Sequence, residues 1–551
     1  MNVVTDKGLI SPFPKSAPPA STLIVCDIES LSSSEQLLMV SLQGLVNRKN
    51  PCLYLCFNHS EYLWPERLKR RQIVQIIEET KDWRSILTRF RSEIRGLVIT
   101  DPDSPATVNI ATMLAGIEDA LIVSPELLPQ FDSSWTILSD LRGKWQNKVD
   151  AYQWAYANLW PQLRHDIVAI RYPNDVRGRD YLIQFRIFTF WISGAVDGQQ
   201  PGSSQEAETS FAENIFTELP ANCPIMGYPY AGEGIGPGEG GGVALATGYG
   251  KYIVCDCPNL SVHSGAPAPV FKQPELQPIT LDPNKVYLTF IISDGDNLNC
   301  WDSAHLPLWQ CGERGQIPLG WNVMPGCYDL IPDMLAYYYE TASENDYFVA
   351  CGGGIGYANP YRYANRVSQP EQVRAAYLAQ TAYYLQQLDL NILNPYHLGY
   401  GIDHQNVAEF LPLAEGFPEA QRILKHYAES IPGLVGFLPD YARTPGITYP
   451  MSCYLIQTAD RQVPVAHAMT EHFWPSKGKD GDITARVDEI RNLTDGIRPA
   501  FIHAFTVNWC FDPNDIAEVL RQLGPDFIAI RPDQFLDLGR QHWQPSHWGK
   551  S

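Results

Sequence analysis

The chain has 551 residues, of which 45% are hydrophobic and 19% are charged, which is the composition of a globular protein long enough for three or four domains. Its formal net charge of −20 argues against nucleic acids and anionic membranes as partners, because binding to phosphate needs clustered Lys and Arg side chains. No apolar run reaches the roughly 18 residues of a membrane span, so we expect a soluble protein with no membrane partner.

The first 20 residues are rich in Pro and Ser and predict a flexible arm over 1–20. They lack the basic and apolar segments of a secretory signal peptide. The twelve cysteines form no CxxC pair, so buried free thiols are the expected state. Together these observations favour a cytoplasmic location.

Apolar runs that alternate with amphipathic stretches predict small parallel α/β units in the N-terminal half. The expected strands are 22–26, 52–57, 97–100 and 120–123, and the expected helices are 34–48, 108–117 and the stretch 138–163. We expect an N-terminal α/β domain over 21–105, a second small α/β domain over 106–175 and a third over 176–284. The third contains a Gly-rich tract at 227–242 and a Pro-rich linker at 264–284.

Seven or eight βα units are expected over 285–540, which is the usual length of a closed (β/α) barrel. The expected strands are 286–292, 317–324, 347–351, 392–396, 434–438, 463–468, 499–507 and 527–530. The expected helices are 328–343, 370–389, 418–430, 482–496, 513–523 and 533–540. The fold class is therefore α/β, with a C-terminal barrel-like domain after small N-terminal domains, and a tail over 541–551.

Active sites of such barrels lie at the carboxyl ends of the strands. In this chain these ends carry polar and acidic residues, as a site that cleaves sugars requires. We expect substrate contacts from Asn297, Asp403 and Trp509 at these ends, and acid/base chemistry from Asp294, Asp296, Asp440 and Glu471.

The sharpest signal is the pair Asp294 and Asp296 after the first barrel strand. If the strand continues, the two share one face with Cα atoms about 6.6 Å apart, and mutual repulsion favours keeping one protonated as a general acid. A glycosidase needs carboxyl groups on both sides of the scissile bond, so the partner should come from another strand, with Asp440 and Glu471 as candidates. The alternative interpretation is a turn held by Asx side chains, with or without a divalent cation at Asp294 and Asp296.

Two Gly-rich stretches resemble nucleotide loops but lack their patterns. The segment 352–360 contains no complete GxGxxG, and Tyr357 and Pro360 would obstruct a phosphate at a helix N-terminus. A backbone that needs positive φ beside a substrate is the better explanation for this segment, in which Gly354 and Gly356 are expected substrate contacts. The tract 232–242, with Glu233, has no Gly-Lys-Ser/Thr and predicts a loop over the site or between domains.

Two further residues keep two interpretations each. His503 lies in the middle of an expected strand, where a core histidine is favoured over a substrate contact. Trp509 is equally suited to a sugar platform and to core packing. No GxSxG elbow is present, so Ser-His-Asp chemistry is not supported.

The chain resembles the GxGYxYP family of putative glycoside hydrolases. The motif corresponds to Gly354-Ile-Gly356-Tyr357-Ala-Asn359-Pro360, with Asn359 where the family has its second Tyr. Similar stretches are Leu42 to Arg48, Ala111 to Gly116, Gly227-Tyr-Pro, Asn259-Leu-Ser and Ile292 to Asn297, so the resemblance runs from about residue 22 to residue 538. It implies a barrel-like C-terminal domain after small α/β domains, and hydrolysis of a carbohydrate.

Three functions remain open. The first is a glycoside hydrolase in which Asp294 or Asp296 works with Asp440 or Glu471, Tyr357 and Trp509 line the sugar site, and no cofactor is needed. The second is a metal-dependent polysaccharide deacetylase, although none of the 12 histidines forms an HxxxH pair. The third is a carbohydrate-binding or scaffold protein that keeps the barrel without an acid pair.

Overall fold

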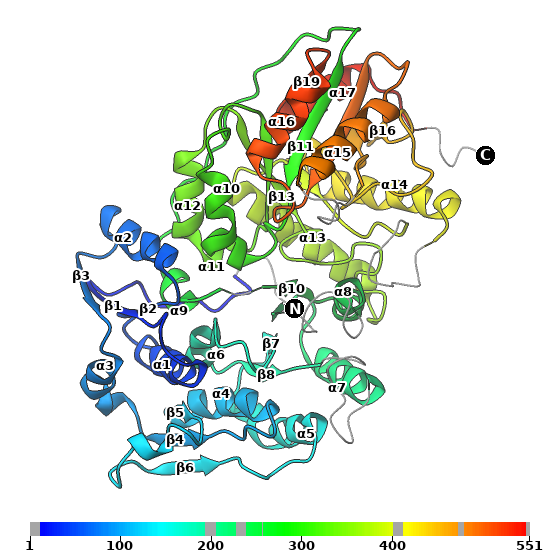
Figure 1. Cartoon of the computed structure of the whole chain (residues 1–551). Coiled ribbons are helices and arrows are strands. Elements are labelled where there is room, and N and C mark those ends of the chain that lie inside the picture. Colours follow the sequence, from blue (N-terminus) through cyan, green and yellow to red (C-terminus); the bar gives the residue numbers. More distant parts are fainter. Residues whose placement is uncertain are drawn as a thin grey trace. The chain divides into compact units, whose positions relative to one another are not determined.

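The computed structural model describes residues 11–192, 205–227, 238–255, 257–400, 411–471 and 479–546. The chain forms two compact units (Figure 1). Unit 1 comprises Met1–Pro269 together with Asp329–Ala336, and unit 2 comprises Val270–Tyr328 together with Tyr337–Ser551. Within the described residues no helix combines the length and the apolar character that crossing a membrane requires.

Unit 1 contains three small sheets of parallel strands. The first has the order β2 (Leu53–Cys56), β1 (Thr22–Asp27), β3 (Ile76–Thr80). The second has the order β5 (Ala120–Val123), β4 (Gly96–Ile99), β6 (Ile137–Asp140), and the third β10 (Tyr252–Val254), β9 (Pro224–Met226), β7 (Val168–Ile170), β8 (Phe188–Phe190). The second sheet therefore takes strands from both sides of the boundary expected at 105/106.

Capping residues and a glycine in the sequence explain where helix α1 of unit 1 begins and how closely it packs. Helix α1 (Ser33–Val46) starts with a capping box in which Ser32 and Glu35 bond each other's backbone N–H. Gly44 lets α6 (Arg179–Phe185) approach closely, because a Cβ there would lie 2.7 Å from the Asp180 carbonyl oxygen. The other α-helices are α2 (Leu63–Arg70), α3 (Trp83–Arg89), α4 (Ala106–Glu118), α5 (Lys148–Leu159), α7 (Gln205–Glu218), α8 (Gly238–Gly248) and α9 (Leu260–His263).

Two expectations for this half need correction. The stretch 138–163 is not one helix, since β6 occupies its start and α5 only part of the rest. Residues 11–20 contain no helix or strand, yet they are packed: Phe13 is 3% exposed and the Tyr181 hydroxyl donates to the Pro14 carbonyl (2.5 Å). This part of the expected flexible arm is held by buried side chains.

Unit 2 is built on a nearly closed, barrel-like sheet, which confirms the expected fold class. The path of hydrogen-bonded strands is β16 (Cys453–Gln457), β17 (Gln462–Ala466), β15 (Gly436–Phe437), β14 (Ile392–Asn394), β13 (Asp346–Cys351), β12 (Leu319–Val323), β11 (Val286–Ile292) and β18 (Ala500–Thr506). Pairing is parallel except between β16 and β17. A parallel bridge between Ala468, just past β17, and His503 of β18 brings the two sides of the sheet together.

Helices connect the barrel strands, as the sequence predicts (Figure 1). They are α10 (His305–Trp309), α11 (Cys327–Leu330), α12 (Pro332–Thr341), α13 (Pro370–Gln387), α14 (Leu413–Ser430), α15 (Lys479–Leu493), α16 (Pro513–Leu523) and α17 (Pro532–His542). The short turns of the chain are the 3-10 helices η1 (His59–Tyr62), η2 (Arg91–Glu93), η3 (Leu128–Gln130) and η4 (Trp160–Gln162), and the π-helix η5 (Cys300–Ala304).

The amino end of the barrel is filled by the last strand and the last helix. Strand β19 (Phe527–Ala529) pairs with the first residues of β11, whereas β12 pairs with its last two. Helix α17 lies across the same end, since a Cβ on Gly436 would meet Leu536 at 2.7 Å and a Cβ on Gly320 would meet Pro532 at 2.8 Å. The opposite end of the barrel, at the carboxyl ends of the strands, is where the candidate residues gather.

Candidate active site at the carboxyl ends of the barrel strands

The acidic turn after β11 is held tightly against the neighbouring strand. Asp294 adopts a left-handed backbone conformation with φ of 64°. The Gly295 carbonyl accepts hydrogen bonds from the Met324 N–H (2.9 Å) and the Trp301 indole N–H (3.0 Å). A Cβ on Gly295 would lie only 1.4 Å from the Asn322 carbonyl oxygen, so this position requires glycine.

The carboxyl groups of this turn act on side chains across the barrel. Asp296 is 6% exposed and Asp294 is half-buried, with the Ser293 hydroxyl donating to the Asp294 carboxylate. Burial raises the pKa of the Cys351 thiol and of the Tyr396 hydroxyl well above their usual values, and the charges of both aspartates raise them further. Cys351 ends β13 and Tyr396 follows β14, so the acidic turn after β11 affects side chains of two other barrel strands electrostatically.

A second acidic centre lies at the ends of β15 and β17. The Asp440 Oδ2 atom accepts a hydrogen bond from the Tyr400 hydroxyl (2.7 Å) and lies 2.7 Å from His467 Nδ1. The other ring nitrogen of His467, Nε2, lies 2.8 Å from the Tyr454 hydroxyl. Asp440 itself has a left-handed backbone with φ of 76°, a conformation that is uncommon for residues other than glycine.

Two asparagines connect the acidic centres. The Asn322 side chain donates to Asn394 Oδ1 (2.9 Å) and to the Tyr396 hydroxyl (2.9 Å). The Asn394 side chain in turn donates to the Asp440 carbonyl (3.1 Å). Since Gly295 rests on Asn322, an unbroken series of contacts joins the Asp294–Asp296 turn to Asp440. Both centres therefore belong to the same end of the barrel.

The Gly-rich segment after β13 positions an aromatic pair at this end. Gly352 and Gly353 have φ of 78° and 96°, and a Cβ on Gly354 would lie 2.4 Å from the Tyr377 hydroxyl. Tyr357 is 3% exposed, and its hydroxyl lies 2.8 Å from His397 Nε2. The two rings are stacked, with centroids 5.8 Å apart and planes 11° apart.

Family models match the chain in four successive stretches. The GxGYxYP_N 1st domain matches residues 22–92, the GxGYxYP_N second domain 94–163 and the GxGYxYP third domain 165–265. The GxGYxYP putative glycoside hydrolase C-terminal domain matches residues 284–540. The chain belongs to the GxGYxYP family. The resemblance identified from the sequence motifs is confirmed.

A solved structure supports the fold of this GxGYxYP protein. A crystal structure of a putative hydrolase from Bacteroides thetaiotaomicron VPI-5482 is similar with a TM-score of 0.79 at 20% identity, covering 98% of this chain and 100% of that chain. A crystal structure of a putative polysaccharide deacetylase from Mycobacterium smegmatis gives a TM-score of 0.31 at 9% identity over 51% of this chain and 99% of that chain, which is too low to indicate a shared fold. A search of curated proteins gave no match.

The other residues expected at the site have different surroundings. Glu471 is on the surface, where its carboxylate is 63% exposed and pairs with Arg443 (3.2 Å). Trp509 is 46% exposed just past β18. Asn297 caps its own turn, accepting the Asn299 N–H on its side chain (3.1 Å), as the Asx interpretation expects. Glu233 and Asp403 lie outside the described residues.

His503 is fully buried in β18 and next to the second acidic centre. Its Nδ1 atom lies 3.0 Å from the Ala466 carbonyl oxygen, and burial lowers its pKa to about 4. The charge of Asp440 raises this pKa, so the two groups are close. His503 therefore lies in the barrel wall behind Asp440.

Sequence reasoning missed several side chains of this site: Asn322, Asn394, Tyr396, His397, Tyr400, His467 and Tyr454. A signal existed for His397, which follows the expected strand 392–396 directly and so falls under the strand-end rule. No signal existed for Tyr400 and Tyr454, because their roles arise only from distances between separate elements.

Among the residues that the structure describes, no group of three or more His, Cys, Asp or Glu side chains is arranged to hold a metal ion.

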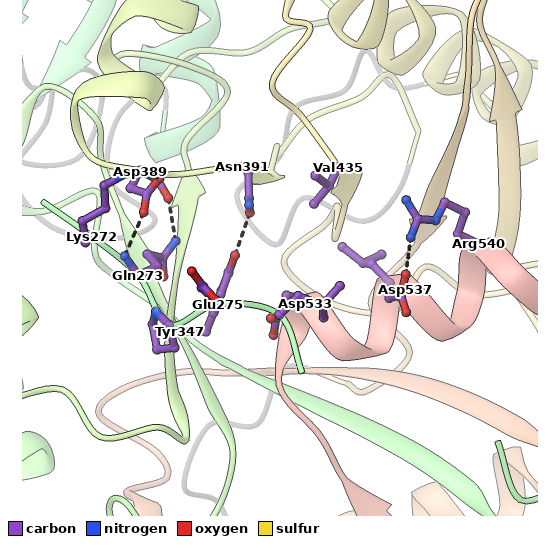
Figure 2. A pocket seen from close by; sticks show the side chains of 13 residues that line it. Lys272, Gln273, Glu275, Tyr347, Asp389, Asn391, Val435, Asp533, Asp537 and Arg540 are labelled. Carbon is purple, nitrogen blue, oxygen red and sulfur yellow. Dashed lines mark hydrogen bonds and ion pairs between the residues drawn. The ribbon is translucent and has the colours of Figure 1, made fainter. Parts of the chain in front are cut away.

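A separate cavity of about 580 Å³ lies at the amino end of the barrel of this GxGYxYP protein. Figure 2 shows Tyr347, Asn391 and Val435 at the starts of neighbouring strands, facing residues of α17. Its polar groups largely bond one another: the Tyr347 hydroxyl donates to Asn391 (2.9 Å), and Asp537 pairs with Arg540. In such barrels residues at the amino end contribute to stability and residues at the carboxyl end to catalysis. This cavity is therefore not part of the candidate active site.

Proposed function

We propose that this GxGYxYP protein is a glycoside hydrolase whose two working carboxyl groups are Asp296 and Asp440, with Asp294 beside the first. One observation carries the proposal: the asparagine-mediated contacts place the turn after β11 and the end of β15 at one end of one barrel. A glycosidase needs carboxyl groups from two directions around the scissile bond, which neighbours on a single strand cannot provide.

The surroundings of the two groups suit different tasks. Asp296 is 6% exposed and lies beside thiol and aromatic side chains, so we assign it the role of general acid, which in glycosidases falls to a carboxyl group shielded from water. Asp440 is oriented by the Tyr400 and His467 side chains at Oδ2, as a nucleophile or base requires. Asp440 is preferred over Glu471 because Glu471 is largely exposed.

In the proposed reaction Asp296 gives its proton to the glycosidic oxygen while the bond from that oxygen to C1 breaks. Asp440 either attacks C1 or takes a proton from the water that does so. Trp509, which is 46% exposed, would offer a ring face to the sugar, and the buried Tyr357 would line the site. The reaction as proposed uses no cofactor.

The test is turnover of a panel of aryl glycosides and polysaccharides, measured by released phenol or reducing sugar. Asp296→Asn is expected to lower kcat by about 100-fold or more, because the variant cannot donate the proton, while its unfolding midpoint stays at the wild-type value. Asp440→Asn is expected to behave in the same way. The matched control is Asp495→Asn, at an exposed position before β18, which is expected to keep wild-type turnover.

Three results would decide against the assignment. Unchanged turnover in Asp296→Asn would exclude Asp296 as the general acid. Loss of turnover in Glu471→Gln together with full turnover in Asp440→Asn would make Glu471, and not Asp440, the second working carboxyl group. Wild-type protein that binds glycans but releases no product from any of them contradicts the hydrolase itself.

A further inference from the structure

We infer that His467 is a positioning residue that fixes the carboxylate of Asp440 through a buried relay formed by Tyr454, His467, Asp440 and Tyr400. The inference rests on the proposed function, in which Asp440 is one of the two working carboxyl groups. It goes beyond that function by assigning a task to three side chains that the sequence did not single out.

The relay is buried and closely packed. His467, one residue past β17, is 0% exposed, and the Asp440 side chain is 11% exposed. The His467 ring packs against Phe417 of α14 with centroids 5.0 Å apart and is stacked on Tyr454 of β16 with centroids 5.5 Å apart. This packing fixes the plane of the ring, and the contacts of Nδ1 with Asp440 and of Nε2 with Tyr454 fix its orientation in that plane.

The direction of each hydrogen bond follows from the chemistry of the partners. Burial raises the pKa of the Tyr400 and Tyr454 hydroxyls well above the usual value, and the charge of Asp440 raises both further. Both phenols therefore stay protonated and can each donate a hydrogen bond. A carboxylate can only accept, so the His467 ring proton sits on Nδ1 and is donated to Asp440, and in the relay Nε2 then accepts from the Tyr454 hydroxyl.

These donors converge on one oxygen of Asp440. The Tyr400 hydroxyl, which also contacts His467 Nδ1, and the His467 ring both reach Oδ2. The hydrogen bonds that the structure gives this carboxylate are therefore both at Oδ2. A carboxylate held at one oxygen presents the other in a fixed direction, which is the geometry that a reacting carboxylate needs.

Asp440 has a particular need for such support. It lies three residues past the short strand β15 (Gly436–Phe437), in a left-handed backbone conformation, so its own strand restrains it little. The supporting groups come from β16, from the residue after β17 and from the segment after β14. The antiparallel strand β16 thus brings Tyr454 to the carboxyl end of the barrel. The one antiparallel pair in the described part of this sheet, β16 with β17, therefore supplies a member of the relay.

The experiment compares two amide replacements of one histidine. The amide nitrogen of His467→Asn can take the place of Nδ1 and donate to Asp440, whereas that of His467→Gln takes the place of Nε2 and leaves Asp440 Oδ2 without this donor. We expect kcat of His467→Gln to fall about 100-fold with KM near the wild-type value, and kcat of His467→Asn to stay within about 10-fold of wild type. A structural role alone would lower the folded fraction of both variants and leave this split absent.

A second readout needs no substrate. Spectra of ¹⁵N-histidine-labelled protein are expected to show His467 as the Nδ1-protonated tautomer, with a proton resonance that shifts in Asp440→Asn. An Nε2-protonated tautomer, or equal kcat in His467→Gln and wild type, overturns the relay. If no glycoside is turned over by wild type but the expected tautomer is observed, the relay stands and the hydrolase proposal fails.

Discussion

Gly295 shows how strictly one residue of the candidate site is determined by its surroundings. Its neighbour across the strand pair is backbone, not side chain: the nearest atoms to an added Cβ are the Asn322 carbonyl oxygen at 1.4 Å and carbon at 2.2 Å. Backbone of a central barrel strand cannot shift by that much without breaking its pairing with β13. The separation of Asp294 and Asp296 by a glycine is therefore a packing requirement that also sets the position of both acids.

Replacing this glycine by alanine should destabilise unit 2. We expect Gly295→Ala to lower the free energy of unfolding by about 3 kcal/mol or more, because the methyl group overlaps backbone that cannot relax. Chemical denaturation followed by tryptophan fluorescence measures this. Gly312→Ala is the control, since nothing lies within 4 Å of an added Cβ there, and equal effects of the two changes would contradict the packing argument.

Among the elements, helix α17 closes the amino end of the barrel. Phe535 and Leu536 are 0% and 1% exposed, and Phe535 contacts Phe501 of β18 and Trp543 in edge-to-face geometry. The helix closes the amino end of the barrel, where β19 also inserts, so the apolar interior there is shielded from water. The polar network of Asn322, Asn394 and Asp440 therefore lies at the opposite, carboxyl end of the barrel.

Truncating Leu536 tests this closure. Leu536→Ala is expected to cost about 2–5 kcal/mol in the free energy of unfolding, since it opens a cavity against Gly436 of β15. Turnover per folded molecule should stay unchanged, because the change lies at the opposite end from the candidate site. Gln541→Ala, at an exposed position of the same helix, is the control with little expected effect. A loss of turnover in the Leu536 variant without loss of stability would refute this division between the two ends.

At the scale of the whole molecule, buried histidines tie stability to pH. His305 of α10 is 1% exposed and lies between Trp301 and Trp321, with ring centroids 4.9 and 6.0 Å away. Burial lowers its pKa to about 3. The unfolded chain protonates this ring at its ordinary pKa, so between those two values the unfolded state holds more protons and stability falls as the pH falls.

The expected size of this effect is about 2 kcal/mol of unfolding free energy lost between pH 7.5 and pH 5 through His305 alone. His305→Phe keeps an apolar ring and should flatten the pH dependence by that amount. Denaturation curves at several pH values measure it. His542→Gln, at an exposed position, should keep the wild-type slope, and a His305→Phe variant as acid-sensitive as wild type would contradict the argument.

Much of the fold was predictable because its signals are local. The strand Val286–Ile292 has seven buried residues in a row and was found with its boundaries, as was Ala120–Val123. Strand β3 was missed because its residues are mostly exposed and carry no apolar pattern, and β16 because an antiparallel strand interrupts the expected βα order. The stretch 138–163 was misjudged since β6 at its start is only four residues long and exposed to half-buried, so it carries no strand signal.

The sequence by itself determined the family, the α/β class, most of the barrel strands and the end of the barrel at which Asp294, Asp296 and Asp440 lie. It could do so because buried strands and the polar residues after them are contiguous in the chain. Only the tertiary structure decided which groups meet there. The contacts of Asp440 with His467 and Tyr400, and those of Asn322 with Asn394, join positions 27 to 72 residues apart. Such contacts depend on strand register and loop course, which no local pattern of residues encodes.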